Sequence, residues 1–214
     1  MIKVAEFNPL DYINLTRLCA SELKSRALTI LPIPKADIFN GAGVYALYYV
    51  GAKGIYKDIS GTKRPIYVGK AEPSGGRKGL TQSGHTRALY WRLSKHVKSI
   101  TTTKLKISDF RCRFIVLQPI WIKMAERLLI EEFKPPWNLL IDGFGNNPQG
   151  KNRAQQIRSR WDTLHPGRPA ADALTANPKN AAELKRLLSD FLAKPPTAAA
   201  VAKQLDAGGD DDEE

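Results

Sequence analysis

Residues 43–50 read Gly-Val-Tyr-Ala-Leu-Tyr-Tyr-Val and combine aromatic with β-branched side chains, a composition typical of a β-strand. A second, shorter strand is predicted by the apolar stretch Ile66-Tyr67-Val68. Residues 51–64 between them are mostly polar and contain glycine, so we expect a hairpin with a long inserted loop. A third strand is predicted from Phe110 to Leu117, where apolar residues alternate with arginines.

Helices are expected on both sides of these strands. Asn8-Pro9 can begin a first helix, Thr86 can cap a second, and a third runs from about Ile120 to Phe133. Asn180-Ala-Ala-Glu183 resembles a capping box and precedes an apolar helical stripe. The sequence therefore predicts an α+β fold, with a small three-stranded antiparallel sheet flanked by helices and with helical extensions at both ends.

The expected organisation is one core domain with extensions. An N-terminal helical arm covers 1–40, the core 41–145 and a C-terminal helical extension 146–194. The alanine-rich and then acidic end, 195–214, is expected to be a disordered tail.

The charge indicates the class of partner. Lys and Arg number 33 against 21 Asp and Glu, a net charge of +12, and six of those acids lie in residues 206–214. Residues 1–205 therefore carry a net charge of +18. A body this basic favours a polyanionic partner such as nucleic acid, although a generally basic protein is the alternative.

Composition also bears on location. No apolar run is long enough to span a membrane and the first residues do not form a secretory signal, so no membrane partner is expected. Two cysteines, Cys19 and Cys112, cannot alone form a zinc cluster or a disulfide framework. These features favour a reduced, cytoplasmic location.

One carboxylate stands on an apolar helix face. Ile122, Ala125, Leu129 and Phe133 surround Glu126 at helical spacing, where an ionised group is costly unless it is paired or metal-bound. The alternatives are a buried salt bridge, a metal ligand or a catalytic acid. Glu131 and Glu132 fall in the last turn of the same helix, where we expect easier access to water.

Two further pairs can carry chemistry. Arg92 and His96 are four residues apart on the second helix, which suits two groups converging on one phosphate; a solvated basic face is the alternative. Tyr45 and Tyr67 lie one on each hairpin strand, each near a glycine. Cross-strand packing alone is the alternative for the tyrosines.

Taken in order, Gly43-Val44-Tyr45, Tyr67-Val68-Gly69, Arg92-x-x-x-His96, Glu126 and Asn138 resemble the pattern of the GIY-YIG nuclease family. Valine replaces the middle isoleucine of both triads. Gly41–Tyr49, Pro65–Ala71, Trp137-Asn138, Asp142–Asn146, Trp161-Asp162 and His165–Arg168 are similar to type II restriction endonucleases of this family that cleave CCGCGG. This resemblance covers about residues 40–168.

The resemblance implies a role for each matching side chain. Tyr45 would position or activate the attacking water, with a pKa lowered by nearby positive charge, and Tyr67 would help to hold that water. Arg92 and His96 would face the scissile phosphate, Lys70 would add positive charge there, and Asn138 would buttress the site. Glu126 would bind one Mg²⁺.

The resemblance also implies double-stranded DNA as substrate, a homodimer on a palindromic site and a cognate DNA methyltransferase. Two other functions remain open at this point: a homing or repair nuclease of the same family, and a basic nucleic-acid-binding module without activity.

The target sequence must be read by polar side chains near the site. Two segments flank it and supply such side chains, although most of these could contact only phosphates. We expect DNA contacts from Arg77, Lys78, Gln82, His85 and Arg87 in the first segment, and from Asn146, Asn147, Gln149, Lys151, Asn152, Arg153, Arg158 and Arg160 in the second.

Overall fold

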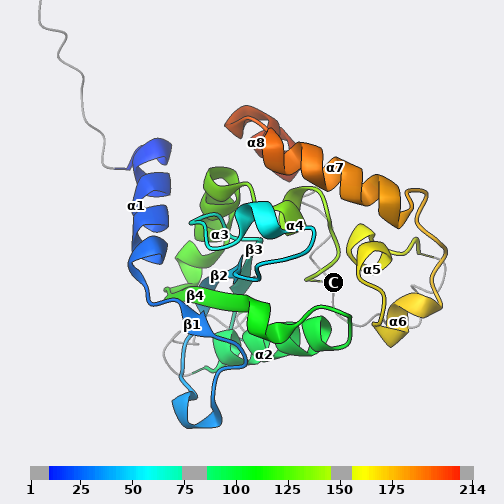
Figure 1. The fold of residues 1–214 in the computed structure, drawn as a ribbon. Coiled ribbons are helices and arrows are strands. Elements are labelled where there is room, and N and C mark those ends of the chain that lie inside the picture. Colours follow the sequence, from blue (N-terminus) through cyan, green and yellow to red (C-terminus); the bar gives the residue numbers. More distant parts are fainter. Residues whose placement is uncertain (1–9, 74–85, 146–155, 208–214) are drawn as a thin grey trace, which may run out of the picture.

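A computed structural model describes residues 10–73, 86–145 and 156–207 (Figure 1). One antiparallel sheet lies at its centre. Its strands are β1 (Thr29–Ile30), β2 (Gly43–Tyr49), β3 (Tyr67–Ala71) and β4 (Phe110–Val116), in the spatial order β1-β4-β2-β3. The sheet therefore has four strands, and the expectation of three was wrong. The added strand, β1, pairs only Thr29 and Ile30 with β4, and a two-residue strand is too short to show alternation in the sequence.

Helices account for most of the other described residues. They are α1 (Tyr12–Ser25), α2 (Ala88–Thr101), α3 (Pro119–Phe133), α4 (Pro136–Leu139), α5 (Arg160–Leu164), α6 (Pro169–Asp172), α7 (Ala181–Ala193) and α8 (Ala198–Ala207). Short 3-10 turns cover Lys35–Asp37, Lys57–Ile59 and Ile107–Asp109. Within the described residues, no helix is both long and apolar enough to cross a bilayer.

Helix starts agree with the sequence in one case and differ in two. The capping box of α7 is confirmed. The Asn180 side chain accepts from the backbone N–H of Glu183, and the Glu183 side chain accepts from the backbone N–H of Asn180. α1 begins at Tyr12 after Asp11, so it starts later than expected, and Asn8-Pro9 lies outside the described residues. Arg87, rather than Thr86, precedes the first turn of α2.

Each face of the sheet is covered by its own apolar core. Tyr45, Leu47 and Tyr49 of β2 point into one core with α2, α4, α5 and α7, while Val44 and Ala46 point into a second with α1, α3 and α8. In Figure 1, α2 and α3 accordingly lie on opposite sides of the sheet. Strand alternation thus sends neighbouring residues of β2 to opposite faces.

The C-terminal extension belongs to the same core as the sheet. Trp161 of α5 and Leu184 of α7 are fully buried together with the side chains that α2 contributes. Residues after 145 therefore complete the core on this face of the sheet.

α8 replaces part of the expected disordered tail. Val201 is fully buried in the core that contains α3, and Gln204 Nε2 donates to the carbonyl of Leu139 at 2.8 Å. Disorder was the wrong expectation for residues 198–207, because a high-propensity alanine run carries a narrow apolar stripe that packs on α3. Residues 208–214 lie outside the described part of the chain.

Candidate active site

The register of the hairpin brings the two tyrosines together. Tyr45 is opposite Gly69 and Leu47 is opposite Tyr67, so the tyrosines are diagonal neighbours on one face, with ring centroids 6.2 Å apart. A Cβ at Gly69 would collide with the Tyr45 hydroxyl. The glycine of the second triad therefore leaves room for the tyrosine of the first.

Helix α2 covers this face of the hairpin and brings His96 and Arg92 to the two tyrosines. The Tyr45 hydroxyl lies 2.5 Å from Nε2 of His96, whose side chain is buried. Arg92, one turn earlier, is partly buried and donates from Nη2 to the Gly145 carbonyl at 2.9 Å. The pair therefore faces the tyrosines, and a wholly solvated basic face was the wrong alternative.

Burial dominates the protonation of these groups. It raises the pKa of Tyr45 well above its ordinary value; the nearby Tyr67 hydroxyl adds to this, and Arg92 offsets it only in part. Arg92 thus lowers this pKa as expected, but burial outweighs its effect in the protein alone. Burial and then the Glu126 charge raise the pKa of Tyr67 to about 12.

The pKa of His96 is shifted in the opposite direction, downward. Burial, and then the charges of Arg92, Arg168 and Lys95, lower its pKa well below the ordinary value. The imidazole is therefore neutral at pH 7, and Tyr45 is an uncharged phenol. A neutral histidine nitrogen beside a phenol can accept the phenol's proton.

Glu126 approaches β3 from the other face of the sheet. Lys70 follows the second triad, points toward α3 and donates to Glu126 Oε2 at 2.8 Å. The side chains of Lys70 and Glu126 are 25% and 18% exposed, so this ion pair stays in reach of solvent and of a ligand. The salt bridge considered for Glu126 is thus present, and the Glu126 charge also acts on Tyr67 across the edge strand.

Glu131 differs from the expectation. It is only 7% exposed, accepts from the Tyr12 hydroxyl at 2.6 Å and pairs with Arg127 at 3.0 Å. Easier access to water was wrong here, because α1 and α8 pack over the end of α3 and cover this carboxylate.

The donor set at Glu126 fits a hydrated Mg²⁺. Across residues 10–73, 86–145 and 156–207, no three His, Cys, Asp or Glu side chains gather as a ready-made metal cage. A single carboxylate oxygen donor beside a substrate phosphate suits Mg²⁺, which prefers oxygen ligands and keeps several of its waters.

Asn138 acts on the backbone of the edge strand. Its Oδ1 accepts from the Val68 N–H and its Nδ2 donates to the Val68 carbonyl, both at 2.8 Å. β3 is at the edge of the sheet, and the Asn138 amide makes the hydrogen bonds to Val68 that a further strand would otherwise make. It thereby holds the backbone between Tyr67 and Gly69.

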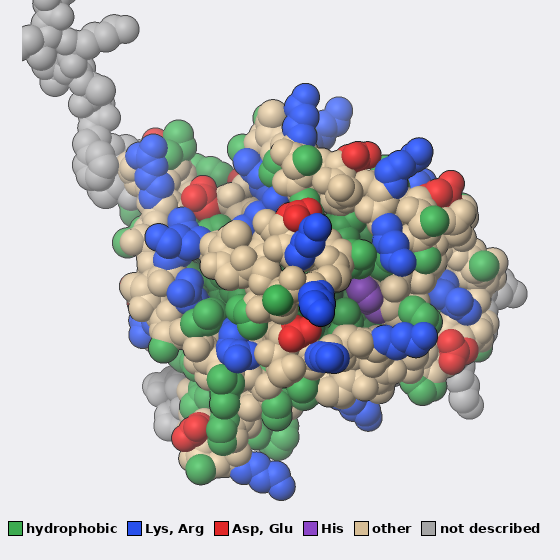
Figure 2. Space-filling model, in the orientation of Figure 1, with side chains coloured by type: hydrophobic (Ala, Val, Ile, Leu, Met, Phe, Trp, Pro, Cys, Tyr) green, Lys and Arg blue, Asp and Glu red, His purple; other side chains and the backbone are tan. Residues whose placement is uncertain are grey.

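Of the residues expected to contact DNA, three lie in described segments. Arg87 is exposed at the start of α2, whereas Arg158 and Arg160 donate to the carbonyls of Ala171 and Leu140 at 3.0 Å. The others lie outside the described residues: Arg77, Lys78, Gln82, His85, Asn146, Asn147, Gln149, Lys151, Asn152 and Arg153. Figure 2 shows Lys and Arg side chains spread over the whole visible face, in keeping with the net charge.

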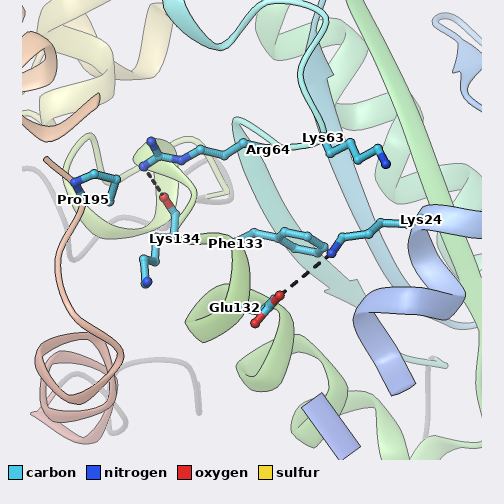
Figure 3. Close-up of a pocket in the computed structure, with 7 residues that line it drawn as sticks. All are labelled: Lys24, Lys63, Arg64, Glu132, Phe133, Lys134 and Pro195. Carbon is cyan, nitrogen blue, oxygen red and sulfur yellow. Dashed lines mark hydrogen bonds and ion pairs between the residues drawn. The ribbon is translucent and has the colours of Figure 1, made fainter. Parts of the chain in front are cut away.

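A shallow pocket of about 300 Å³ lies apart from these groups (Figure 3). Its lining comprises Lys24, Lys63, Arg64, Glu132, Phe133, Lys134 and Pro195. Lys24 lies over the Phe133 ring and pairs with Glu132, while Arg64 donates to the Lys134 carbonyl at 2.8 Å. No expected site residue lines this pocket.

The sequence did not identify Phe144, Gly145, Asp162 and Arg168 as parts of the site. The Phe144 ring stacks on His96, with centroids 4.5 Å apart and planes inclined by 18°. A Cβ at Gly145 would lie 2.5 Å from the Tyr67 hydroxyl. Asp142–Asn146 resembles the family, but no local pattern shows which neighbours such a segment contacts.

The family model described as the Eco29kI GIY-YIG domain matches residues 37–192. A search of curated proteins gave no match. The family match includes all seven residues expected at the catalytic centre, and it reaches beyond residue 168 into α7. Because it covers well over half of the chain, this chain belongs to the Eco29kI family of GIY-YIG nuclease domains.

Proposed function

We propose that this nuclease is a site-specific, Mg²⁺-dependent double-strand DNA endonuclease of a type II restriction system, with CCGCGG as its target. The observation that carries the proposal is that Tyr45, Tyr67, Arg92 and His96 gather on one face of the β2–β3 hairpin, while Glu126 reaches β3 from the other face and its charge acts on Tyr67. The basic surface suits a DNA substrate.

In the proposed hydrolysis, a water oxygen forms a bond to phosphorus while the bond from phosphorus to O3′ breaks. Tyr45 takes the proton of the water as it passes its own proton to Nε2 of His96, 2.5 Å away. This relay is favoured over a preformed phenolate because the pKa of Tyr45 is raised and His96 is neutral. The leaving O3′ takes its proton from solvent.

Charge builds up on the phosphate oxygens as water attacks. The Arg92 guanidinium is a planar donor group that can bind those oxygens, and Lys70 adds a second positive charge. Glu126 would hold Mg²⁺, which when bound supplies further neutralisation of the phosphate and of the leaving oxygen. Asn138 keeps β3, and with it Tyr67, in place.

Cleavage of both strands of a palindrome calls for two sites related by a twofold axis. We therefore propose a homodimer on DNA, working in a cell that protects its own target with a methyltransferase. Arg87 and the two segments that flank the site are the proposed contacts to DNA.

The test is digestion of two plasmids with Mg²⁺, one containing CCGCGG and one lacking it. Discrete fragments from the first plasmid only, abolished by EDTA and by Glu126→Ala, are expected. Glu132→Ala is the matched control, because Glu132 lies on the same helix and pairs with Lys24 at 3.8 Å, away from the tyrosines. Glu126→Ala should still bind DNA.

Other outcomes would change the proposal. Discrete fragments at other sequences would retain the nuclease and reject the target. Binding of DNA without metal-dependent cleavage would reject the enzyme and favour the non-catalytic module.

A further inference from the structure

The ion pair between Arg168 and Asp162 contacts residues 143–145, which pack over His96, Tyr67 and Arg92 and are called the covering segment below. Arg168 donates from Nε to Asp162 Oδ1 at 2.6 Å and from Nη2 to Asp162 Oδ2 at 2.7 Å. Their side chains are 16% and 7% exposed. In this buried bidentate pair, two guanidinium nitrogens bind the two carboxylate oxygens, and the single ammonium group of a lysine cannot make both hydrogen bonds in this geometry.

The same guanidinium also binds the backbone of the covering segment. Arg168 Nη2 donates to the Gly143 carbonyl at 2.8 Å, and Nη1 donates to the Phe144 carbonyl at 3.3 Å. Its Cζ lies 4.6 Å from the centroid of the Trp161 ring. Arg168 is therefore held from three sides and fixes two successive peptide groups.

Those peptide groups determine where two catalytic side chains sit. Phe144, fully buried, stacks on the His96 ring and meets Tyr67 edge-on, with centroids 5.0 Å apart. The next residue, Gly145, offers the carbonyl that accepts from Arg92. A shift of residues 143–145 would thus move the contacts of His96, Tyr67 and Arg92 together.

The Asp162 carboxylate is itself anchored. Ser159 caps α5 by accepting from the Asp162 N–H at 3.0 Å, and its hydroxyl donates to Asp162 Oδ2 at 2.7 Å. The turn before Arg168 is also fixed, because a Cβ at Gly167 would collide with the Thr102 carbonyl at the end of α2. Both ends of the ion pair are therefore tied to rigid elements.

We infer that Arg168, held by Asp162, is a positioning residue of the nuclease site: it fixes residues 143–145 so that Phe144 orients His96 and the Gly145 carbonyl orients Arg92. This inference rests on the proposed nuclease function. Arg168 touches no reacting atom, and its effect passes through the covering segment. Its charge is also among those that lower the pKa of His96, after burial and Arg92.

The experiment compares Arg168→Met, Arg168→Lys and Asp162→Asn with the wild-type protein. Arg111→Met is the matched control, because Arg111 likewise binds two backbone carbonyls, of Ser108 and Phe110, but none in the covering segment. Cleavage rates at saturating DNA are measured below the unfolding temperature of every variant, and DNA binding is measured in EDTA.

We expect Arg168→Met to lower kcat by about 10–100-fold, as misplacement of catalytic groups by about 1 Å does, with DNA affinity changed by no more than about threefold. Arg168→Lys should recover little of the lost kcat, and Arg111→Met should keep the wild-type kcat. Phe144→Leu should lower kcat as well, and combining it with Arg168→Met should add little, because both act through one contact.

A second measurement does not depend on cleavage. The chain has three histidines, so the ring signals of His96 can be assigned in an NMR spectrum by comparison with His96→Gln. Arg168→Met and the milder Asp162→Asn should shift these signals, and Arg111→Met should not. A folded Arg168→Met protein with wild-type kcat and unmoved His96 signals would overturn the inference. Absence of cleavage by the wild-type protein would instead overturn the proposed function.

Discussion

The hydroxyl of Tyr45 lies 2.5 Å from Nε2 of His96, in a part of the core where both side chains are shielded from water. Burial raises the pKa of the phenol and lowers that of the imidazole, so both groups are neutral at pH 7. A hydrogen bond between a phenol donor and a neutral imidazole acceptor is suited to proton transfer as charge develops on the attacking water.

Tyr45→Phe is therefore expected to lower the rate of DNA cleavage by about 10²–10⁴-fold, because the relay loses its first member. His96→Gln should have a similar effect, and the double variant should be no slower than the slower single variant, since the two groups act as one unit. Single-turnover cleavage measures this. Tyr56→Phe is the control, because the Tyr56 hydroxyl pairs with His165 at 2.6 Å in the same core. Additive losses at Tyr45 and His96 would contradict the relay.

Asn138→Ala is expected to lower the free energy of unfolding by about 1–3 kcal/mol, because two hydrogen bonds to Val68 are lost on the edge strand. Cleavage should fall with it, since β3 carries Tyr67. Urea unfolding and cleavage are measured on the same variant. Asn177→Ala removes two hydrogen bonds to backbone groups of Arg158 and Lys179 elsewhere, so it should cost stability and leave cleavage unchanged. A stable but inactive Asn138→Ala protein would show that Asn138 contacts the reaction directly.

The parts of the fold that could be predicted are those with a strong local pattern. The strand at 43–50 and the helix at 120–133 agree with β2 and α3 to within one residue at each end, because an apolar run and a 3.6-residue period both act over short distances. The position of Glu126 on the apolar side of α3 follows from the same period. The sheet register then brings Tyr45 and Tyr67 together.

The features that could not be predicted depend on distant partners. Glu131 is buried because Tyr12, 119 residues away, packs against it. Arg168 reaches carbonyls 24 and 25 residues earlier, and nothing in its own neighbourhood indicates those contacts. The raised pKa of Tyr45 likewise follows from complete burial, which a strand pattern alone does not reveal.

Acid should destabilise the protein through its buried histidines. Burial lowers the pKa of His165 from 6.5 to about 3, so the unfolded chain binds a proton below pH 6.5 that the folded chain does not. Stability is therefore full above pH 6.5 and falls by about 1.4 kcal/mol per pH unit for this residue as pH decreases. His96, whose pKa shifts in the same direction, adds to the slope.

Urea unfolding at pH 7, 6 and 5 measures this slope. His165→Gln should flatten it, because glutamine can still accept from Tyr56 but takes up no proton. Arg17→Gln is a control at an exposed position of α1 and should leave the slope unchanged. Parallel pH profiles for the wild-type protein and His165→Gln would contradict the assignment of the slope to this histidine.

Two truncations should separate α8 from the acidic end that follows it. Deletion of 198–214 is expected to lower the free energy of unfolding by about 2–4 kcal/mol, because the fully buried Val201 contributes about 1.5–3 kcal/mol and the hydrogen bond from Gln204 adds about 0.5–1.5 kcal/mol. Deletion of 208–214 removes only glycine and acidic residues and should leave that free energy nearly unchanged. The free energy of unfolding of Val201→Ala should lie between those of the two truncated proteins, since this substitution leaves a cavity against α3 but keeps the helix. Equal stability of the two truncated proteins in urea would show that α8 contributes nothing to the fold.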